Sequence, residues 1–218
     1  DQGAARRTHL TVTDDIDALV DELGARAGTD RTTEATPEVG IIMGSDADLD
    51  TMAGAYDALR RLGFAEQTDY DDPPEARFTF ESYVVSAHRT PDLMYAYGET
   101  AADRGLDVLI AGAGGKSADL PNMTASIAYP LPVIGVPVQE ESVSSVIGMP
   151  TGAPIVTVDA GKSFNAALSA VQILSRAHPE LEGRLDDYHD ELQDDVGSVS
   201  KRLHELGTAR FREERDDR

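Results

Sequence analysis

Short apolar runs alternate with longer amphipathic stretches through the middle of this chain. The runs span residues 39–43, 83–85, 107–111, 131–136 and 155–158. They are too short for helices, and turn-forming residues bound them, which is typical of strands buried on both faces of a parallel sheet. We therefore predict five strands that lie in one sheet.

The stretches between these runs carry apolar residues at helical spacing. Helices are predicted over 46–62, 91–104, 117–127 and 162–175. A strand, a turn and a helix thus repeat about five times, which favours an α/β fold with a parallel sheet and helices on both faces. Residues 65–80 break the repeat, and their acidic character predicts a surface insertion.

The two ends of the chain differ from this central pattern. Residues 1–38 are predicted to be an extension, with a helix near 13–28 and a polar linker, and residues 39–178 to be the α/β domain. Residues 179–218 are predicted to be a charged helical extension with an apolar stripe, which we expect to dock on the same or a neighbouring subunit. The stripe comprises Leu181, Leu185, Tyr188, Leu192 and Val196.

Acidic residues outnumber basic ones by 40 to 19, which gives a formal net charge of −21. Such a surface repels nucleic acid and anionic membranes, so we expect neither as a partner. Because the excess is spread along the chain, it favours adaptation to a salt-rich cytosol over an ordinary acidic surface. The sequence lacks cysteine, a signal-peptide core and an apolar stretch of about 20 residues, so we expect a cytoplasmic protein.

Three predicted strand ends carry small or reactive residues: 44–48, 86–89 and 112–117. In a doubly wound sheet these ends lie on one edge, where ligands bind. His88 is the only one of the five histidines outside the flanking regions, and an imidazole can both donate and accept a proton near neutral pH. The adjacent Arg89 offers a planar fork that suits phosphate.

The first and third of these loops each allow more than one interpretation. Ser45 and Asp48 have the spacing of a helix capping box, but they also suit a polar ligand at the helix N-terminus. The third loop lacks the glycines of a Walker A motif or a dinucleotide fingerprint, although its bare backbone allows a flat ligand to approach. Because no histidine or carboxylate cluster has metal-ligand spacing, we expect no metal site.

Four motifs, in order, resemble the successive signatures of the catalytic subunit of phosphoribosylaminoimidazole carboxylase. They lie at 43–48, 85–91, 110–115 and 132–139, and the similarity covers about residues 39–176. Bacterial-type members of that family are N5-carboxyaminoimidazole ribonucleotide mutases of purine biosynthesis. The resemblance implies a three-layer flavodoxin-like fold, a homo-octamer without a metal or organic cofactor, and functional coupling to an ATP-dependent carboxyaminoimidazole ribonucleotide synthase.

The resemblance also implies roles for the loop residues. His88 would be the general acid and base that moves the proton between carboxylation sites. The residues that would hold the ribonucleotide and enclose the released CO2 are Ser45, Asp48, Ser86, Arg89, Gly112, Gly114 and Gly115. The central domain would then be catalytic, and the chain would be an isomerase.

The third loop departs from the bacterial pattern. Residues 114–123 read GGKSADLPNM where bacterial members usually carry GGAAHLPGM, so one residue is added and Asp119 lies nearest the place of the histidine. Lys116 either offsets charge near a carboxylate or points to solvent. This departure leaves direct carboxylation of aminoimidazole ribonucleotide by CO2 open beside the mutase. Because a fold does not dictate function, a non-catalytic nucleotide-binding module stays open as a second alternative.

Overall fold

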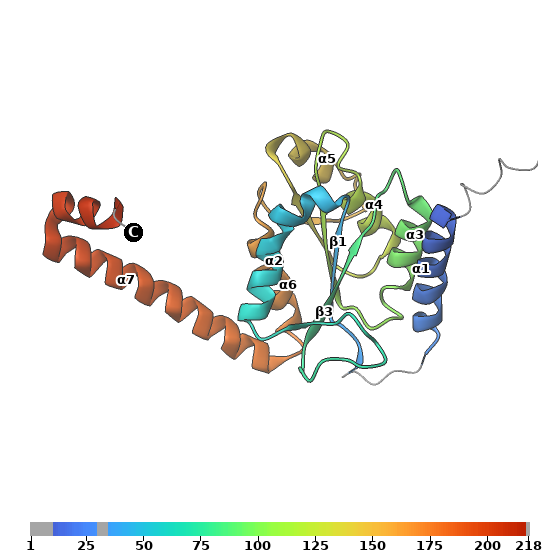
Figure 1. Ribbon diagram of the computed structural model, residues 1–218, viewed down its shortest axis with the longest axis horizontal. Helices are drawn as coiled ribbons and strands as arrows, with labels where there is room; N and C mark the ends of the chain where they lie inside the picture. Colours follow the sequence, from blue (N-terminus) through green and yellow to red (C-terminus); the bar gives the residue numbers. More distant parts are fainter. Residues whose placement is uncertain (1–10, 30–34, 217–218) are drawn as a thin grey trace, which may run out of the picture. The chain divides into compact units, whose positions relative to one another are not determined.

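Six parallel strands form one open sheet in the computed structural model, which describes residues 11–29 and 35–216 (Figure 1). The strands are β1 (Val39–Met43), β2 (Ala65–Glu66), β3 (Thr79–Val84), β4 (Val108–Ala113), β5 (Val133–Pro137) and β6 (Val156–Thr157). Their order is β2-β3-β1-β4-β5-β6, and every neighbouring pair is parallel. Without the two-residue edge strand β2, this is the 2-1-3-4-5 order of flavodoxin-like folds.

Helices cover both faces of this sheet (Figure 1). On one face α2 (Leu49–Arg61) packs against α6 (Ser163–Leu174), and on the other α3 (Pro91–Thr100) packs against both α1 (Thr11–Ala27) and α4 (Leu120–Ile127). Three short helical segments follow β1 and β5: η2 (Asp46–Asp48), η3 (Glu140–Ser142) and α5 (Val143–Val146). The predicted three-layer α/β fold is confirmed.

The central strands are buried along their whole length, as their apolar runs predict. All residues of β1, β4 and β5 are buried. Glycines in these strands make room for larger side chains: a Cβ on Gly112 would collide with Sδ of Met52, and a Cβ on Gly40 with Oη of Tyr97. The helices can therefore lie close to the sheet.

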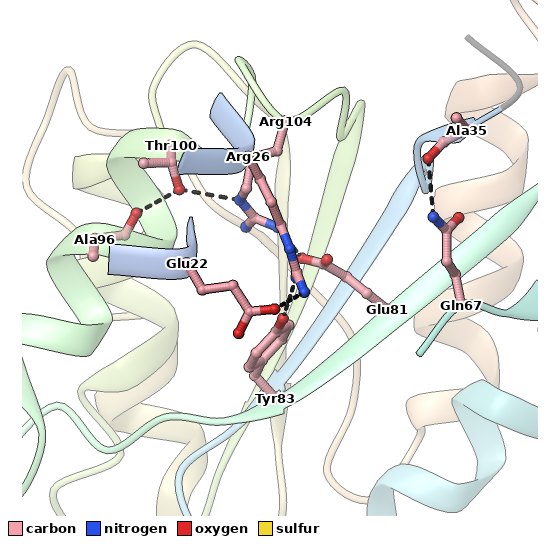
Figure 2. Close-up of polar contacts among 9 residues, drawn as sticks. All are labelled: Glu22, Arg26, Ala35, Gln67, Glu81, Tyr83, Ala96, Thr100 and Arg104. Carbon is pink, nitrogen blue, oxygen red and sulfur yellow. Dashed lines mark hydrogen bonds and ion pairs between the residues drawn. The ribbon is translucent and has the colours of Figure 1, made fainter. Parts of the chain in front are cut away.

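Strand β3 begins at Thr79, four residues before the predicted run at 83–85. The prediction missed its first half because Glu81 is charged, yet this side chain is only 1% exposed. Its carboxylate pairs with Arg104, which follows α3, at 2.6 Å, and the Arg104 side chain is fully buried (Figure 2). A buried ion pair lets a charged residue occupy a core strand position.

The segment 65–80 is only in part the surface insertion that its acidic sequence predicted: residues 68–69, 71–72, 75 and 77 are exposed, but other residues are buried. Ala65–Glu66 forms the edge strand β2, and Gln67, Tyr70 and Phe78 are buried. The Gln67 amide donates to the carbonyl of Ala35 at 2.9 Å (Figure 2), and the guanidinium of Arg26 lies 3.7 Å from the centre of the Tyr70 ring. Polar and aromatic contacts with neighbouring segments thus hold this part of the chain in place.

Helix α1 confirms the helix predicted near 13–28, and the structure ties it to the sheet. Leu23 is 1% exposed, and Arg26 donates to the Tyr83 hydroxyl at 2.7 Å (Figure 2). Residues 1–10 and 30–34, which make up much of the predicted extension and linker, lie outside the described residues.

The structure divides after Leu174 into two compact units. The second contains α7 (Pro179–Asp216), whose one non-helical residue is Gly207, with φ of 73°. Leu181 is buried, but further along the stripe Leu192 and Val196 are exposed. We retain as predictions that the stripe docks on the same or a neighbouring subunit and that domain boundaries lie at residues 38 and 178.

In the described part of the chain, every helix is too short or too polar to cross a lipid bilayer.

Candidate functional site

The loops that follow β1, β3, β4 and β5 surround a cavity of about 390 Å³ at the carboxyl edge of the sheet. Ser45 and Asp48 line it from the first loop, Ser86, His88 and Arg89 from the second, and Gly114 and Gly115 from the third. Parallel strands bring their carboxyl ends to one edge, so residues distant in sequence meet there. The structure thus brings together seven of the eight predicted site residues.

The eighth, Gly112, does not line the cavity. It is an internal residue of β4, not of a turn, and it faces the Met52 side chain of α2. Its small size matters for packing beneath the cavity. Lys116 also lies outside the lining and is exposed, which fits the solvent alternative.

Ser45 and Asp48 form a capping arrangement at the start of η2. The Ser45 hydroxyl accepts from the backbone N–H of Ala47 at 3.3 Å, and the Asp48 carboxylate accepts from the backbone N–H of Ser45. Asp48 is 8% exposed. Burial raises the pKa of Asp48, although the Ser45 hydrogen bond and the Arg89 charge oppose the shift. The capping interpretation is therefore correct, and the same two side chains also face the cavity.

Gly114 leaves room for the Asp48 carboxylate. A Cβ on Gly114 would lie 3.0 Å from Oδ1 of Asp48, whereas one on Gly44 would lie 3.5 Å from Oδ2, an ordinary contact distance. Gly115 adopts φ of 77°, a left-handed conformation that other residues rarely adopt. The glycines of the third loop are thus required by the position of Asp48 and by a turn, in addition to any contact with a ligand.

Arg89 connects the first two loops. Its Nη2 donates to the carbonyl oxygen of Gly44 at 2.9 Å, and its Nε donates to the Ser86 hydroxyl at 3.3 Å. The Thr90 hydroxyl accepts from the backbone N–H of Ser86 at 2.9 Å and thereby holds the loop. A guanidinium fixed in this way at the cavity wall can bind a phosphate with little loss of side-chain entropy.

His88 contacts a residue to which sequence reasoning gave no role. Its Nε2 lies 3.2 Å from Oδ2 of Asp119, whose Oδ1 accepts from the Ser145 hydroxyl at 3.1 Å. Gln139, which follows β5, also lines the cavity and was missed. The position of Asp119 in the altered third loop was the one signal that could have found it; Ser145 lies 26 residues further along the chain and carries no local signal.

Within residues 11–29 and 35–216, no three carboxylate or imidazole side chains are placed to hold a metal ion together. Four groups that titrate or carry charge line the cavity: Asp48, His88, Arg89 and Asp119. One base, one cation and two carboxylates suit a small anionic ligand with hydroxyl groups and a reaction that moves a proton.

The fold and the cavity define a flavodoxin-like α/β protein with a polar site at the carboxyl edge of its sheet. The family model described as AIR carboxylase matches residues 38–195. The chain belongs to this family, as the four sequence motifs predicted.

Curated relatives align with much of this chain. The N5-carboxyaminoimidazole ribonucleotide mutase of Mycobacterium tuberculosis is 46% identical over 78% of this chain and 92% of its own length. The mutase of Bacillus subtilis is 44% identical over 77% of this chain and 98% of its own. The phosphoribosylaminoimidazole carboxylase of Schizosaccharomyces pombe is 41% identical over 79% of this chain but 29% of its own length.

The fold has a counterpart among solved structures. The crystal structure of Treponema denticola PurE aligns with a TM-score of 0.60 and 21% identity, over 79% of this chain and 99% of that one. At this level of identity the similarity shows a shared fold.

Proposed function

We propose that this chain is a mutase that converts N5-carboxyaminoimidazole ribonucleotide into 4-carboxy-5-aminoimidazole ribonucleotide in purine biosynthesis. The observation that carries the proposal is one cavity lined by His88, Arg89 and Asp48, in a chain 46% identical to a curated mutase. The cavity offers a proton carrier, a phosphate-binding cation and an acceptor for sugar hydroxyls.

The polar residues suggest how the ribonucleotide binds. Arg89, held by Gly44 and Ser86, is the phosphate ligand. Asp48 and Ser45 accept hydrogen bonds from ribose hydroxyls, since a carboxylate repels phosphate. The bare backbone at Gly114 and Gly115 lets the flat base approach the end of β4 and encloses the released CO2.

The reaction then balances on one proton carrier. Protonated His88 donates to the exocyclic nitrogen as the carbamate C–N bond breaks and CO2 leaves. The ring carbon C4 attacks this CO2 to form the new C–C bond, and neutral His88 takes the C4 proton, which restores aromaticity and its own charge. Holding CO2 beside C4 makes recapture a proximity effect, and one positioned acid–base group contributes about a hundred- to ten-thousand-fold.

The experiment compares two substrates in high-salt buffer while C4-carboxylated product is followed over time. Wild type should turn over N5-carboxyaminoimidazole ribonucleotide efficiently and should need very high bicarbonate to carboxylate aminoimidazole ribonucleotide. Efficient use of the second substrate at modest bicarbonate would identify a direct carboxylase instead. His88→Asn should bind ribonucleotide but lose turnover, whereas wild type that binds without turnover would be a nucleotide-binding module.

We also propose that the chain assembles as a homo-octamer. Several large apolar side chains are exposed on the α/β unit, and contacts between copies would bury them. They are Leu49, Val84, Tyr95, Tyr129 and Ile147. Light scattering in molar KCl should give eight times the 23.3 kDa chain mass; a mass of one or two chains would contradict the octamer.

The remaining part of the proposal is that the enzyme acts in the cytoplasm, where another enzyme supplies its substrate. The carbamate of a weakly basic amine forms only to a small extent at modest bicarbonate and readily loses CO2, so we propose functional coupling to an ATP-dependent carboxyaminoimidazole ribonucleotide synthase. A mixture of the two purified enzymes with aminoimidazole ribonucleotide, ATP and bicarbonate should yield C4-carboxylated product. Product formation that does not need the synthase or ATP would argue against the coupling.

A further inference from the structure

Asp119 occupies the N-cap position of α4 but does not cap the helix. Its side chain makes no capping hydrogen bond; it contacts His88 through Oδ2 and Ser145 through Oδ1. An aspartate at an N-cap usually accepts from a backbone N–H of the first turn, which stabilises the helix by about 1 kcal/mol. Here both carboxylate oxygens are directed to side chains of two other segments.

We infer that Asp119 is a positioning residue for His88, and that Ser145 holds Asp119 in place. The inference rests on the proposed function, in which His88 moves the proton. A carboxylate 3.2 Å from Nε2 favours the tautomer of the neutral ring that carries its proton on Nε2, and this tautomer leaves Nδ1 to act as the base. The same carboxylate stabilises the imidazolium that forms when Nδ1 takes the C4 proton.

The charges around the cavity agree with this role. The cavity is lined by one guanidinium, that of Arg89, and by two carboxylates, those of Asp48 and Asp119. Within the described part of the chain, Asp119 is the one carboxylate that lies within 4.0 Å of a ring nitrogen of His88. The His88 and Asp119 side chains are 62% and 41% exposed, so water screens the pair and its effect is smaller than that of a buried pair.

A purely structural role for Asp119 would be to join α4 to the segment around α5. That connection has another bond, because the Asn122 amide donates to the carbonyl oxygen of Ser145 at 2.6 Å. Removing the Asp119 charge should therefore leave the α4–α5 connection in place and alter the imidazole. This difference separates the two roles experimentally.

The test compares D119N and S145A with wild type and with D103N, an exposed aspartate outside the cavity, as a matched control. D119N should lower kcat by about 10- to 100-fold, comparable to the loss of carboxylates that orient metal-bound histidines elsewhere. Its KM should stay within about twofold, because Asp119 does not hold the ribonucleotide in the proposed binding mode. S145A should give a smaller loss in kcat, and D103N none.

Nitrogen-15 NMR of the His88 ring supplies a readout that a structural role would not move. In resting wild type the neutral ring should carry its proton on Nε2, and D119N should shift the population toward the Nδ1–H form. If D119N keeps kcat within about twofold of wild type, or leaves the ring signals unchanged, the inference is wrong. If D119N does not fold, S145A decides by the same two criteria.

Failure of this inference is distinguishable from failure of the proposed function. Wild type without turnover contradicts the proposed function, whereas the ring signals still test the Asp119–His88 contact in the resting protein. Normal turnover by D119N contradicts the inference and leaves the mutase proposal standing.

Discussion

Glu38 precedes β1 at the edge of the sheet opposite the cavity, and it makes the stability of the protein depend on pH. Its side chain is 7% exposed; Oε2 accepts from the backbone N–H of Thr79 at 2.7 Å, and Oε1 lies 3.2 Å from Nη1 of Arg77. Burial is the largest effect and raises the pKa of Glu38 to about 7, while the Thr79 bond and the Arg77 charge lower it. The charged form is therefore disfavoured in the fold.

The sign and size of the effect follow from linkage. Between the unfolded value of 4.5 and the folded value of about 7, the folded state holds more protons, so the free energy of unfolding falls as pH rises. The contribution is fully present below pH 4.5 and is lost as pH rises through the folded pKa. With one pKa unit equal to about 1.36 kcal/mol, the loss between about pH 5 and about pH 8 amounts to roughly 2 to 3 kcal/mol.

The measurement is urea unfolding of wild type and Glu38→Gln across this pH range, at fixed KCl and protein concentration. Because other groups titrate too, the quantity to follow is the difference between the two free energies of unfolding. Wild type should lose roughly 2 to 3 kcal/mol relative to Glu38→Gln as pH rises. The exposed Glu75→Gln removes one negative charge without a buried carboxylate and serves as the control.

A difference between wild type and Glu38→Gln that stays flat from about pH 5 to about pH 8 would refute the reasoning. It would mean that Thr79 and Arg77 compensate fully for burial and that Glu38 is ionised in the fold at both limits. A difference that rises with pH would mean that they overcompensate.

Three further predictions concern the site, the core and the surface. Gly114→Ala places a Cβ 3.0 Å from Oδ1 of Asp48 and should displace that carboxylate, which should raise KM by roughly tenfold. The control Gly183→Ala, whose Cβ would have no atom within 4 Å, should leave KM unchanged. Arg104→Met leaves the buried Glu81 carboxylate without its partner and should lower the free energy of unfolding by about 3 to 5 kcal/mol, with partial recovery when Glu81→Met is added. Because the net charge is −21, molar KCl should raise Tm by at least about 5 °C over dilute buffer; equal Tm values would contradict salt adaptation.

The strands and loops that the sequence predicted correctly share one physical property. β1, β4 and β5 are buried on both faces, so their residues form continuous apolar runs that can be read without knowledge of their neighbours. Residues that follow parallel strands lie at the carboxyl edge, so His88 and Arg89, which follow the predicted run at 83–85, were correctly expected at this edge.

What was missed depends on partners far away in the chain. The first half of β3 looked like surface because the ion pair that buries Glu81 involves Arg104, 23 residues further along. Asp119 likewise precedes α4 in the sequence, where an aspartate usually caps the helix. Only the fold brings its carboxylate close to His88. The spacing of apolar residues along a sequence indicates which positions are buried in an apolar core. It does not identify the distant polar residue that pairs with a buried charged side chain.

Asp48 shows why capping and ligand binding are not competing interpretations of the same motif. A carboxylate that served only as a cap could stay in water, where its charge is well solvated. Asp48 instead lies beside Gly44 and Gly114 at the cavity wall, and burial raises its pKa, so the fold holds its charge in an unfavourable position. Hydroxyl donors of a bound sugar would relieve that desolvation, because hydrogen bonds to a carboxylate stabilise its charged form. We therefore infer that the hydrogen bond from Ser45 orients Asp48, and that Gly114 keeps the remaining lone pairs of Asp48 accessible to the ligand.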